Sequence, residues 1–145
     1  MKLVIQRVTQ ASVGINQKTI AKIGPGLLIL IGVGKKDNLK IVQKAAEKIL
    51  NLRIFADKND KMNLSILDIN GEILIVPQFT LLANLEKGRR PYFGQAALPE
   101  TGQKIIQSFA KTLKKSNLNI KEGKFGAQMK VTLTNDGPVT IIYEG

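Results

Sequence analysis

The chain has 145 residues, no cysteine and no histidine. A chain of this length forms one domain that can bury a core without disulfides or metals. The missing imidazole and thiol exclude Ser-His-Asp and Cys-His nucleophile systems and the usual zinc and haem ligands. The longest apolar run, 27–33, is far below the roughly 20 residues of a membrane span, and residues 1–10 lack signal-peptide features, so we expect a cytoplasmic protein with no membrane partner.

Basic residues outnumber acidic ones by 22 to 11, which gives a formal net charge of +11. Such an excess predicts a polyanionic partner, with RNA or DNA first among the candidates, because neutralised phosphates release counterions. A lysine-rich surface without any such partner is the alternative. No stretch is a basic low-complexity tail, so we assign the charge to a folded surface.

The first half of the chain predicts three strands, a central strand and a helix. Strands over 3–8, 11–15 and 18–23 are expected to form a meander that ends at the break 24–26. The apolar stretch 27–34 does not alternate, which predicts a strand covered on both faces. Helical spacing predicts a helix over 39–52 that begins after Asp37 or Asn38. Its expected buried face is Leu39, Val42, Ala46, Ile49 and Leu50.

The second half predicts more strands and one further helix. Strands are expected at 53–55 and 72–82, with a solvated polar turn at 56–61 that lacks the pattern of a calcium loop. A helix begins near Pro99 and buries Ile105, Ile106, Phe109, Ala110 and Leu113. The last strands lie near 119–123, 129–134 and 139–143. We predict a single α/β domain over 1–145, with a mixed, largely antiparallel sheet or barrel-like sandwich flanked by two main helices.

Two strand-like stretches are each interrupted by a proline. In NDGPVT (135–140), Pro138 follows turn residues, which by itself favours a hairpin turn with proline at its exit. In VPQFTLL (76–82), Pro77 and polar residues interrupt an apolar strand, which by itself favours a bulge at a sheet edge.

Taken together, the two stretches resemble the signature motifs of the D-aminoacyl-tRNA deacylase family. Those motifs are Ser-Gln-Phe-Thr and Asn-x-Gly-Pro-Val-Thr, and both occur here in the expected order. Further collinear similarity is found in MKLVIQRV (1–8), GPGLLILIGV (24–33), LRIFADKNDKMNLS (52–65), KGRRPYF (87–93) and GKFGAQM (123–129). The similarity therefore runs from Met1 to about Thr140.

The resemblance implies a homodimeric, metal-independent and cofactor-independent esterase whose partner is the aminoacylated 3′ end of tRNA rather than DNA. The Gly137-Pro138 peptide is implied to be cis and to enter the active site of the other subunit, at the interface. Its carbonyl oxygens would hold the α-ammonium group of the substrate. An L-residue would then clash with the backbone, whereas D-residues and glycine would be accepted.

Residue roles follow from the same resemblance. Gln78, Phe79 and Thr80 would form the catalytic wall, with the amide of Phe79 or Thr80 as oxyanion donor. Phe125, Ala127 and Met129 would hold the terminal adenosine, although core packing is an alternative for Phe125 and Met129. Arg7 would brace the Gly137-Pro138 loop. Lys87, Arg89 and Arg90 would contact the tRNA backbone, with a solvated charge run as the alternative.

One position departs from the family pattern. Pro77 stands where the family usually has serine, and a related animal deacylase that removes L-alanine also has proline there, but it replaces the phenylalanine that is kept here as Phe79. Editing of L-alanyl-tRNA with relaxed chirality therefore remains open. The net charge of +11 leaves RNA binding without catalysis open as well.

Overall fold

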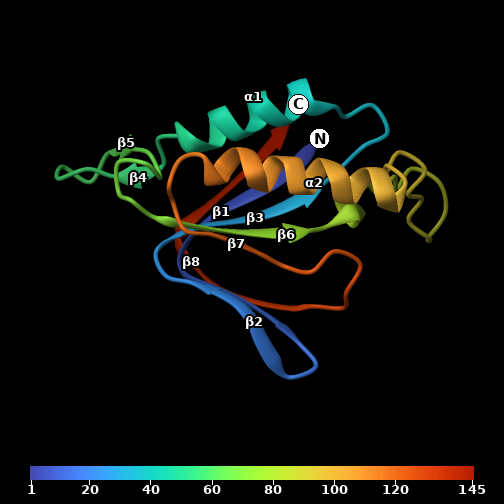
Figure 1. Ribbon diagram of the computed structural model, residues 1–145, viewed down its shortest axis with the longest axis horizontal. Helices are drawn as coiled ribbons and strands as arrows, with labels where there is room; N and C mark the ends of the chain where they lie inside the picture. The colour runs from blue at the N-terminus through green and yellow to red at the C-terminus, as the bar shows by residue number, and fades with distance from the viewer.

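The computed structural model describes all residues, 1–145. Five strands form the path β2-β1-β3-β6-β7, and β8 pairs with the other edge of β1 (Figure 1). The elements are β1 (Lys2–Ile15), β2 (Lys18–Ile23), β3 (Gly26–Gly32), α1 (Leu39–Leu50), β4 (Phe55–Ala56), β5 (Met62–Leu64), β6 (Glu72–Pro77), the 3₁₀ helix η1 (Phe79–Leu82), α2 (Pro99–Lys114), β7 (Ile120–Glu122) and β8 (Lys130–Glu144).

The first strand is one long element where the sequence predicted two. One edge of β1 pairs first with β3 and then with β2, and its other edge pairs with β8. The predicted meander of 3–8, 11–15 and 18–23 was wrong in its first half, because 3–8 and 11–15 belong to the same strand and cannot pair with each other. Its second half is confirmed, since β1 and β2 form an antiparallel pair. The β3–β6 and β6–β7 pairs are parallel and the pairs of β1 are antiparallel, so the predicted mixed sheet is confirmed.

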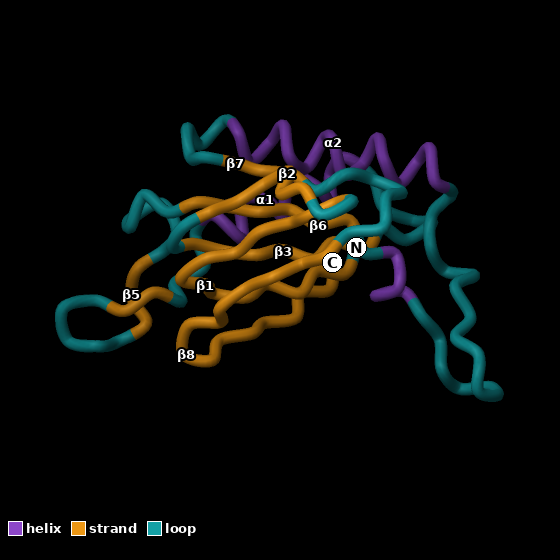
Figure 2. The backbone as a smooth tube through the Cα atoms, turned by 90° about the horizontal axis from the view of Figure 1, so that it is seen from below, coloured by secondary structure: helices purple, strands orange, loops and turns teal.

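Two hydrophobic cores lie on opposite faces of the sheet. The larger cluster of 24 buried residues joins the sheet to α1 and α2, which both cover one face. The smaller cluster of 8 residues lies where β2 and the first part of β8 curl beneath β3 and β6 (Figure 2). Both faces of β3 are therefore buried, as predicted, and the sheet is barrel-like.

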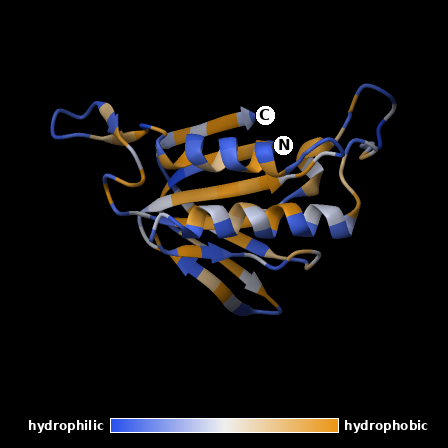
Figure 3. Ribbon diagram, turned by 45° about the horizontal axis from the view of Figure 1, so that its top comes forward, coloured by the Kyte–Doolittle hydropathy of each residue, from blue (hydrophilic) through white to orange (hydrophobic).

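The helices agree with the sequence in most respects. The Asn38 side chain caps α1 by accepting from the amides of Lys40 and Ile41 at 3.0 and 3.2 Å. Val42, Ala46 and Ile49 are buried, but Leu39 is 59% exposed because the first residue of α1 lies beyond the core, and the helix ends at Leu50. All five apolar residues expected inside α2 are buried. Polar residues follow the outer faces of both helices (Figure 3). Neither helix is long and apolar enough to cross a membrane.

The strand predicted over 72–82 is only half correct. β6 ends at Pro77, and the chain then turns into η1. The Gln78 amide makes the last bond to β3, donating to the Ile31 carbonyl at 2.8 Å. Pro77 thus lies at the end of an interior strand, and the predicted bulge at a sheet edge is wrong. At the strand end, the missing N–H of proline removes no hydrogen bond that β6 needs.

The predicted strand 53–55 is reduced to β4, which pairs with β5 to form a small projecting arm. Within the arm, the Asp57 carboxylate accepts from the amides of Asn59 and Lys61 at 2.8 and 3.1 Å. The hydrogen bond from the Asn63 side chain contributes most to lowering the pKa of Asp57. These bonds are internal to the turn, which confirms the predicted solvated turn at 56–61.

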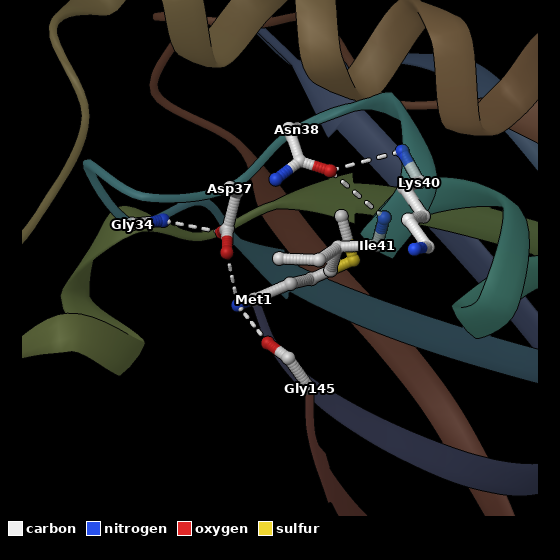
Figure 4. Close-up of polar contacts among 7 residues, drawn as sticks. All are labelled: Met1, Gly34, Asp37, Asn38, Lys40, Ile41 and Gly145. Atoms are coloured by element: carbon white, nitrogen blue, oxygen red, sulfur yellow. Dashed lines mark hydrogen bonds and ion pairs between the residues drawn. The ribbon is translucent and has the colours of Figure 1, made fainter.

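A buried ion pair fixes the turn between β3 and α1 (Figure 4). The Met1 ammonium donates to Asp37 Oδ1 and to the Gly145 carbonyl, both at 2.6 Å. The other oxygen of Asp37 accepts from the Gly34 amide at 2.7 Å. Gly34 in turn pairs with Ala96 as an isolated bridge. The pair therefore supports the segment that precedes α2.

Candidate functional site

A largely apolar pocket lies where β3 and β6 end beside the start of α2. Its volume is about 540 Å³. The lining residues come from β3, β6, the segment before α2, the first half of α2 and the segment that leads into β8. They are Ile31, Val33, Val76, Pro77, Gln78, Phe79, Ala96, Ala97, Pro99, Gly102, Ile106, Phe125, Gly126, Ala127, Met129 and Val131. Several convergent apolar walls with one polar edge are typical of a small-molecule site.

Two of the three predicted catalytic residues, Gln78 and Phe79, line this pocket. Thr80 does not line it, but its hydroxyl accepts a hydrogen bond from the Gln78 side-chain amide. The amides of Phe79 and Thr80 open η1, where the first N–H groups of a helix have no intrahelical acceptor. These amides can therefore donate to an anion. The Thr80 hydroxyl accepts from an amide group that cannot take its proton, so this contact does not activate Thr80 as a nucleophile.

The pocket lining also contains the three residues predicted to hold an adenosine. Phe125, Ala127 and Met129 all line the pocket. Phe125 and Met129 also pack against the two hydrophobic cores, so core packing and pocket lining are both correct for them. Gly123 makes room for one of these side chains, because a Cβ there would lie 2.8 Å from the Met129 sulfur.

The second motif forms a bulge in the middle of β8. Both of its flanks pair with β1, through Gln6–Thr140 and Val8–Asn135, so the hairpin interpretation is wrong. Residues 136–138 are exposed. The Gly137-Pro138 peptide bond is cis, as the resemblance implied. Gly137 has φ +129°, a region that L side chains rarely adopt.

Two side chains hold the bulge in place. Arg7 donates from Nε to the Asp136 carbonyl at 3.0 Å and pairs with its carboxylate at 3.2 Å, while Nη1 donates to the Ile54 carbonyl at 2.6 Å. The Asn135 side chain accepts from the Val139 amide at 2.7 Å and donates to the Val139 carbonyl at 3.1 Å. Arg7 thus contacts the bulge as the sequence predicted.

The bulge and the pocket of the same chain lie well apart. The pocket edge is at the row Leu3–Ile31–Pro77, whereas the bulge contacts Arg7, four residues further along β1. Four strand residues span roughly 13 Å. Neither Gly137 nor Pro138 lines the pocket. One chain therefore does not bring the two motifs to the same small substrate.

The predicted tRNA-contacting residues lie on an excursion beside the pocket. This excursion is the loop 84–92, whose two ends pair through the isolated Asn84–Tyr92 bridge. Lys87, Arg89 and Arg90 are exposed at its tip. Phe93 ends the excursion and packs edge-to-face on Phe79, with ring centroids 5.0 Å apart. The basic excursion is thus joined to the wall that carries Gln78.

The pocket contains residues that the sequence analysis did not identify. Ala96, Ala97 and Gly102 shape it, and Phe93 supports Phe79 from outside. Gly102 lies within α2, where a Cβ would make only ordinary contacts with Phe125, so no close approach marks it. The alanines carry no signal either. None of the lining side chains ionises, so the pocket offers positioning, packing and amide donors rather than a protein acid or base.

Comparisons with known proteins match nearly the whole chain. The family model described as D-Tyr-tRNA(Tyr) deacylase matches residues 4–144. A D-aminoacyl-tRNA deacylase of Thermosipho africanus is 53% identical over 144 residues, covering 99% of this chain and 97% of the relative. A D-aminoacyl-tRNA deacylase of Lactobacillus acidophilus is 48% identical over 144 residues, covering 99% of this chain and 99% of the relative.

Solved structures show the same fold. The c-Myc DNA Unwinding Element Binding Protein matches with a TM-score of 0.94 at 44% identity, covering 100% of this chain and 99% of that chain. A probable eukaryotic D-amino acid tRNA deacylase matches with a TM-score of 0.85 at 18% identity, covering 98% and 97%. At that identity the second match supports the fold alone.

Proposed function

This chain belongs to the D-Tyr-tRNA(Tyr) deacylase family, and on that premise we propose that it hydrolyses the ester bond of D-aminoacyl-tRNA. Water adds to the ester carbonyl, the bond to the terminal ribose oxygen breaks, and free tRNA and a D-amino acid leave. The second substrate is a tRNA that has been wrongly charged with glycine. The reaction removes wrong aminoacyl groups in the cytoplasm before they reach the ribosome.

The observation that carries this proposal is one pocket that contains both groups of predicted residues. Gln78 and Phe79 line it together with Phe125, Ala127 and Met129. An aromatic ring, a thioether and small side chains suit the face of an adenine base, which every tRNA presents at its 3′ end. The ester would then lie beside Phe79.

Catalysis in this pocket depends on position and amide donors. The amide of Phe79 or Thr80, free at the start of η1, stabilises the oxyanion of the tetrahedral intermediate. The 2′-hydroxyl of the terminal adenosine assists the attacking water, because no lining side chain can act as a base. An activated ester is a substrate for which such modest assistance is sufficient.

Chirality is read by Gly137 and Pro138 of a second copy of the chain. The separation of roughly 13 Å between pocket and bulge within one chain supports this arrangement. The exposed bulge of one protomer enters the pocket of its partner, and its carbonyl oxygens accept from the α-ammonium group. With that group and the ester both fixed, an L side chain meets backbone and is rejected.

Apolar residues on the underside of the sheet support the same homodimer. Ile142 is 66% exposed on β8 and Phe79 is 58% exposed on η1. Between them, Val4 and Leu30 are only half-buried. Exposed apolar groups between the pocket and the bulge are what an isologous interface requires.

The tRNA body is held by Lys87, Arg89 and Arg90, whose excursion is attached to the catalytic wall through Phe93. Lysine and arginine contacts with phosphate are sequence-independent, so one surface serves many tRNAs. This is the property that an editing enzyme for many amino acids needs.

Editing of L-alanyl-tRNA is a second candidate function. Pro77, the residue that departs from the family pattern, lines the pocket next to Gln78. A ring at that position changes the shape of the wall that faces the aminoacyl group. Relaxed chirality would be the consequence.

RNA binding without turnover is the candidate from another class, and the net charge of +11 favours it. One structural relative is named for binding a DNA element, which makes nucleic-acid binding by this fold a case to test. A pure binder would retain its affinity when Gly137 or Pro138 is replaced, since those residues are remote from its basic excursion.

The deciding experiment measures deacylation of D-tyrosyl-, L-tyrosyl-, glycyl- and L-alanyl-tRNA by the purified protein in the presence of chelator. We expect loss of D-tyrosine and glycine while L-tyrosine stays attached. A Pro138→Ala variant should lose this discrimination. Release of L-alanine alone would support the second candidate. If nothing is released while tRNA and a DNA oligonucleotide still bind, the protein is a binding module.

A further inference from the structure

A polar face lies on the side of the barrel away from the helices. There β2, β1 and β8 run side by side and turn alternate residues outward (Figures 1 and 2). Ala11 and Val13 point into the small core, so Ser12 and Gly14 point out. We call this outward surface of Ser12, Gly14, Thr19, Lys22, Lys130 and Thr132 the lower face.

Strand register places its lysines around a row of small residues. Lys22 and Thr132 pair with Ser12 from opposite sides. The β1–β2 register then shifts and leaves the exposed Ile20 unpaired, and beyond the shift Thr19 and Lys130 pair with Gly14. With neighbouring strands about 4.8 Å apart, the two lysine Cα atoms are roughly 12 Å apart. Ammonium and hydroxyl groups thus surround a shallow, backbone-rich centre.

No carboxylate opposes these lysines. Residues 9–23 and 130–134 contain neither aspartate nor glutamate. The nearest acids in sequence, Glu122 and Asp136, are already paired with Lys114 and Arg7. Neither Lys22 nor Lys130 takes part in an ion pair. The lower face therefore has an uncompensated positive charge.

The lower face adjoins the pocket through β8. Met129 and Val131 line the pocket, and Lys130 between them is exposed and directed outward. A nucleic-acid chain that leaves the pocket past residues 129–131 would therefore meet Lys130 first. The segment before it adds Lys124, exposed beside the pocket residue Phe125.

We infer that the lower face binds backbone phosphates of the tRNA next to its 3′ end, as a second contact surface distinct from the 87–90 excursion. Lysine ammonium and Ser/Thr hydroxyl groups are usual phosphate ligands, and the centre around Gly14 lets a backbone approach closely. This inference rests on the proposed function, because it takes the occupant of the pocket to be a tRNA end.

A second copy of the chain fits this face poorly. An isologous contact would set lysines against lysines across the axis, without acids to compensate them. The most exposed apolar residue of β8, Ile142 at 66%, lies on the other part of that strand, whereas Ile20 and Val131 near the lower face are less exposed. Charge complementarity favours a polyanion.

The test compares the double variant Lys22→Gln/Lys130→Gln with Lys40→Gln/Lys44→Gln, which removes the same charge from the exposed face of α1. Binding of uncharged tRNA is measured against salt concentration, together with steady-state deacylation of D-tyrosyl-tRNA. For the lower-face variant we expect roughly tenfold weaker binding near 0.1 M salt, and a salt slope smaller by about 1.4 to 1.8. KM should rise with kcat unchanged, and the α1 variant should stay within about twofold of the parent.

Further measurements keep the outcomes separate. Lys22→Arg/Lys130→Arg should retain the affinity, which guards against a folding defect, and hydrolysis of 3′-D-tyrosyl-adenosine should be unchanged in all variants. Equal losses in the lower-face and α1 variants, or no loss in either, overturn the inference. If the parent protein releases no D-tyrosine, the proposed function fails, and the binding comparison still decides whether this face holds RNA.

Discussion

The pocket and the β8 bulge are built in different ways. The pocket is an extension of the hydrophobic cores, since its walls are continuous with buried strands and α2. The bulge is exposed, and hydrogen bonds from Arg7 and Asn135 hold it. A change under the pocket should therefore be felt in the stability of the whole domain, whereas a change in the bulge should be felt mainly in activity.

The largest effect is expected at the ion pair beneath the pocket region. The Asp37 side chain is 5% exposed, and Asp37→Asn removes the carboxylate that pairs with the Met1 ammonium, which keeps its bond to Gly145. Removing one partner of a buried pair costs about 3 to 5 kcal/mol. Urea denaturation of a protein with a free Met1 ammonium should show a loss in this range. A loss near zero would mean that the Gly145 carbonyl alone is a sufficient partner.

Gly137→Ala should lower the activity strongly and the stability only slightly. Its φ of +129° is unfavourable for alanine, and the new Cβ would lie 2.8 Å from a Val139 methyl group and 2.9 Å from Arg7 Nη2. The bulge must shift, and a displacement near 1 Å can cost about 100-fold in rate. Deacylation of D-tyrosyl-tRNA should fall by this factor while the thermal midpoint changes by only a few degrees. Equal damage to stability would remove the distinction between the two regions.

Arg7→Lys tests the brace itself. A lysine cannot reproduce the fork that joins Asp136 to Ile54, and hydrogen bonds to charged groups contribute about 1.5 to 3 kcal/mol. We expect about a tenfold lower rate of deacylation, with weaker rejection of L-tyrosyl-tRNA. The matched control is Arg53→Lys, which loses a similar bond, to the Asn63 carbonyl at 2.6 Å, without touching the bulge. Similar losses in both variants would argue against a role for the bulge.

The sequence predicted the pocket region better than the bulge. Helical periodicity located α2 and its buried residues because such spacing is a local property. Pairing between distant strands is not local, so the continuity of β1 and the shared edge of β2 and β3 were missed. NDGPVT reads as a turn because its composition is that of a turn, and only the pairing of both flanks with β1 makes it a bulge.

The site residues also divide into those that a sequence motif reveals and those that only the folded structure reveals. Gln78 and Met129 were found through the motif resemblance, and the pocket brings them together across 51 positions of sequence. The alanines that shape the wall, and the Phe93 ring behind Phe79, follow from three-dimensional packing that no spacing rule expresses. Asn135 belongs to the motif, but its bonds across the bulge depend on the fold of β8.

The smallest effect concerns the turn that leads into β6 and hence to the pocket wall. The Asp68 carboxylate accepts from the Ser65 amide and hydroxyl, both at 2.7 Å, and the bond from the Ser65 side chain is the first cause that lowers the pKa of Asp68. A lowered folded-state pKa stabilises the protein above the unfolded pKa near 3.9, and the contribution is lost as pH falls through the folded value. Asp68→Asn should therefore be less stable than the parent at pH 7, with a difference that shrinks below about pH 4. Exposed Asp60→Asn is the control, and a difference for Asp68→Asn that persists unchanged into acid would assign its effect to the turn geometry instead of the charge.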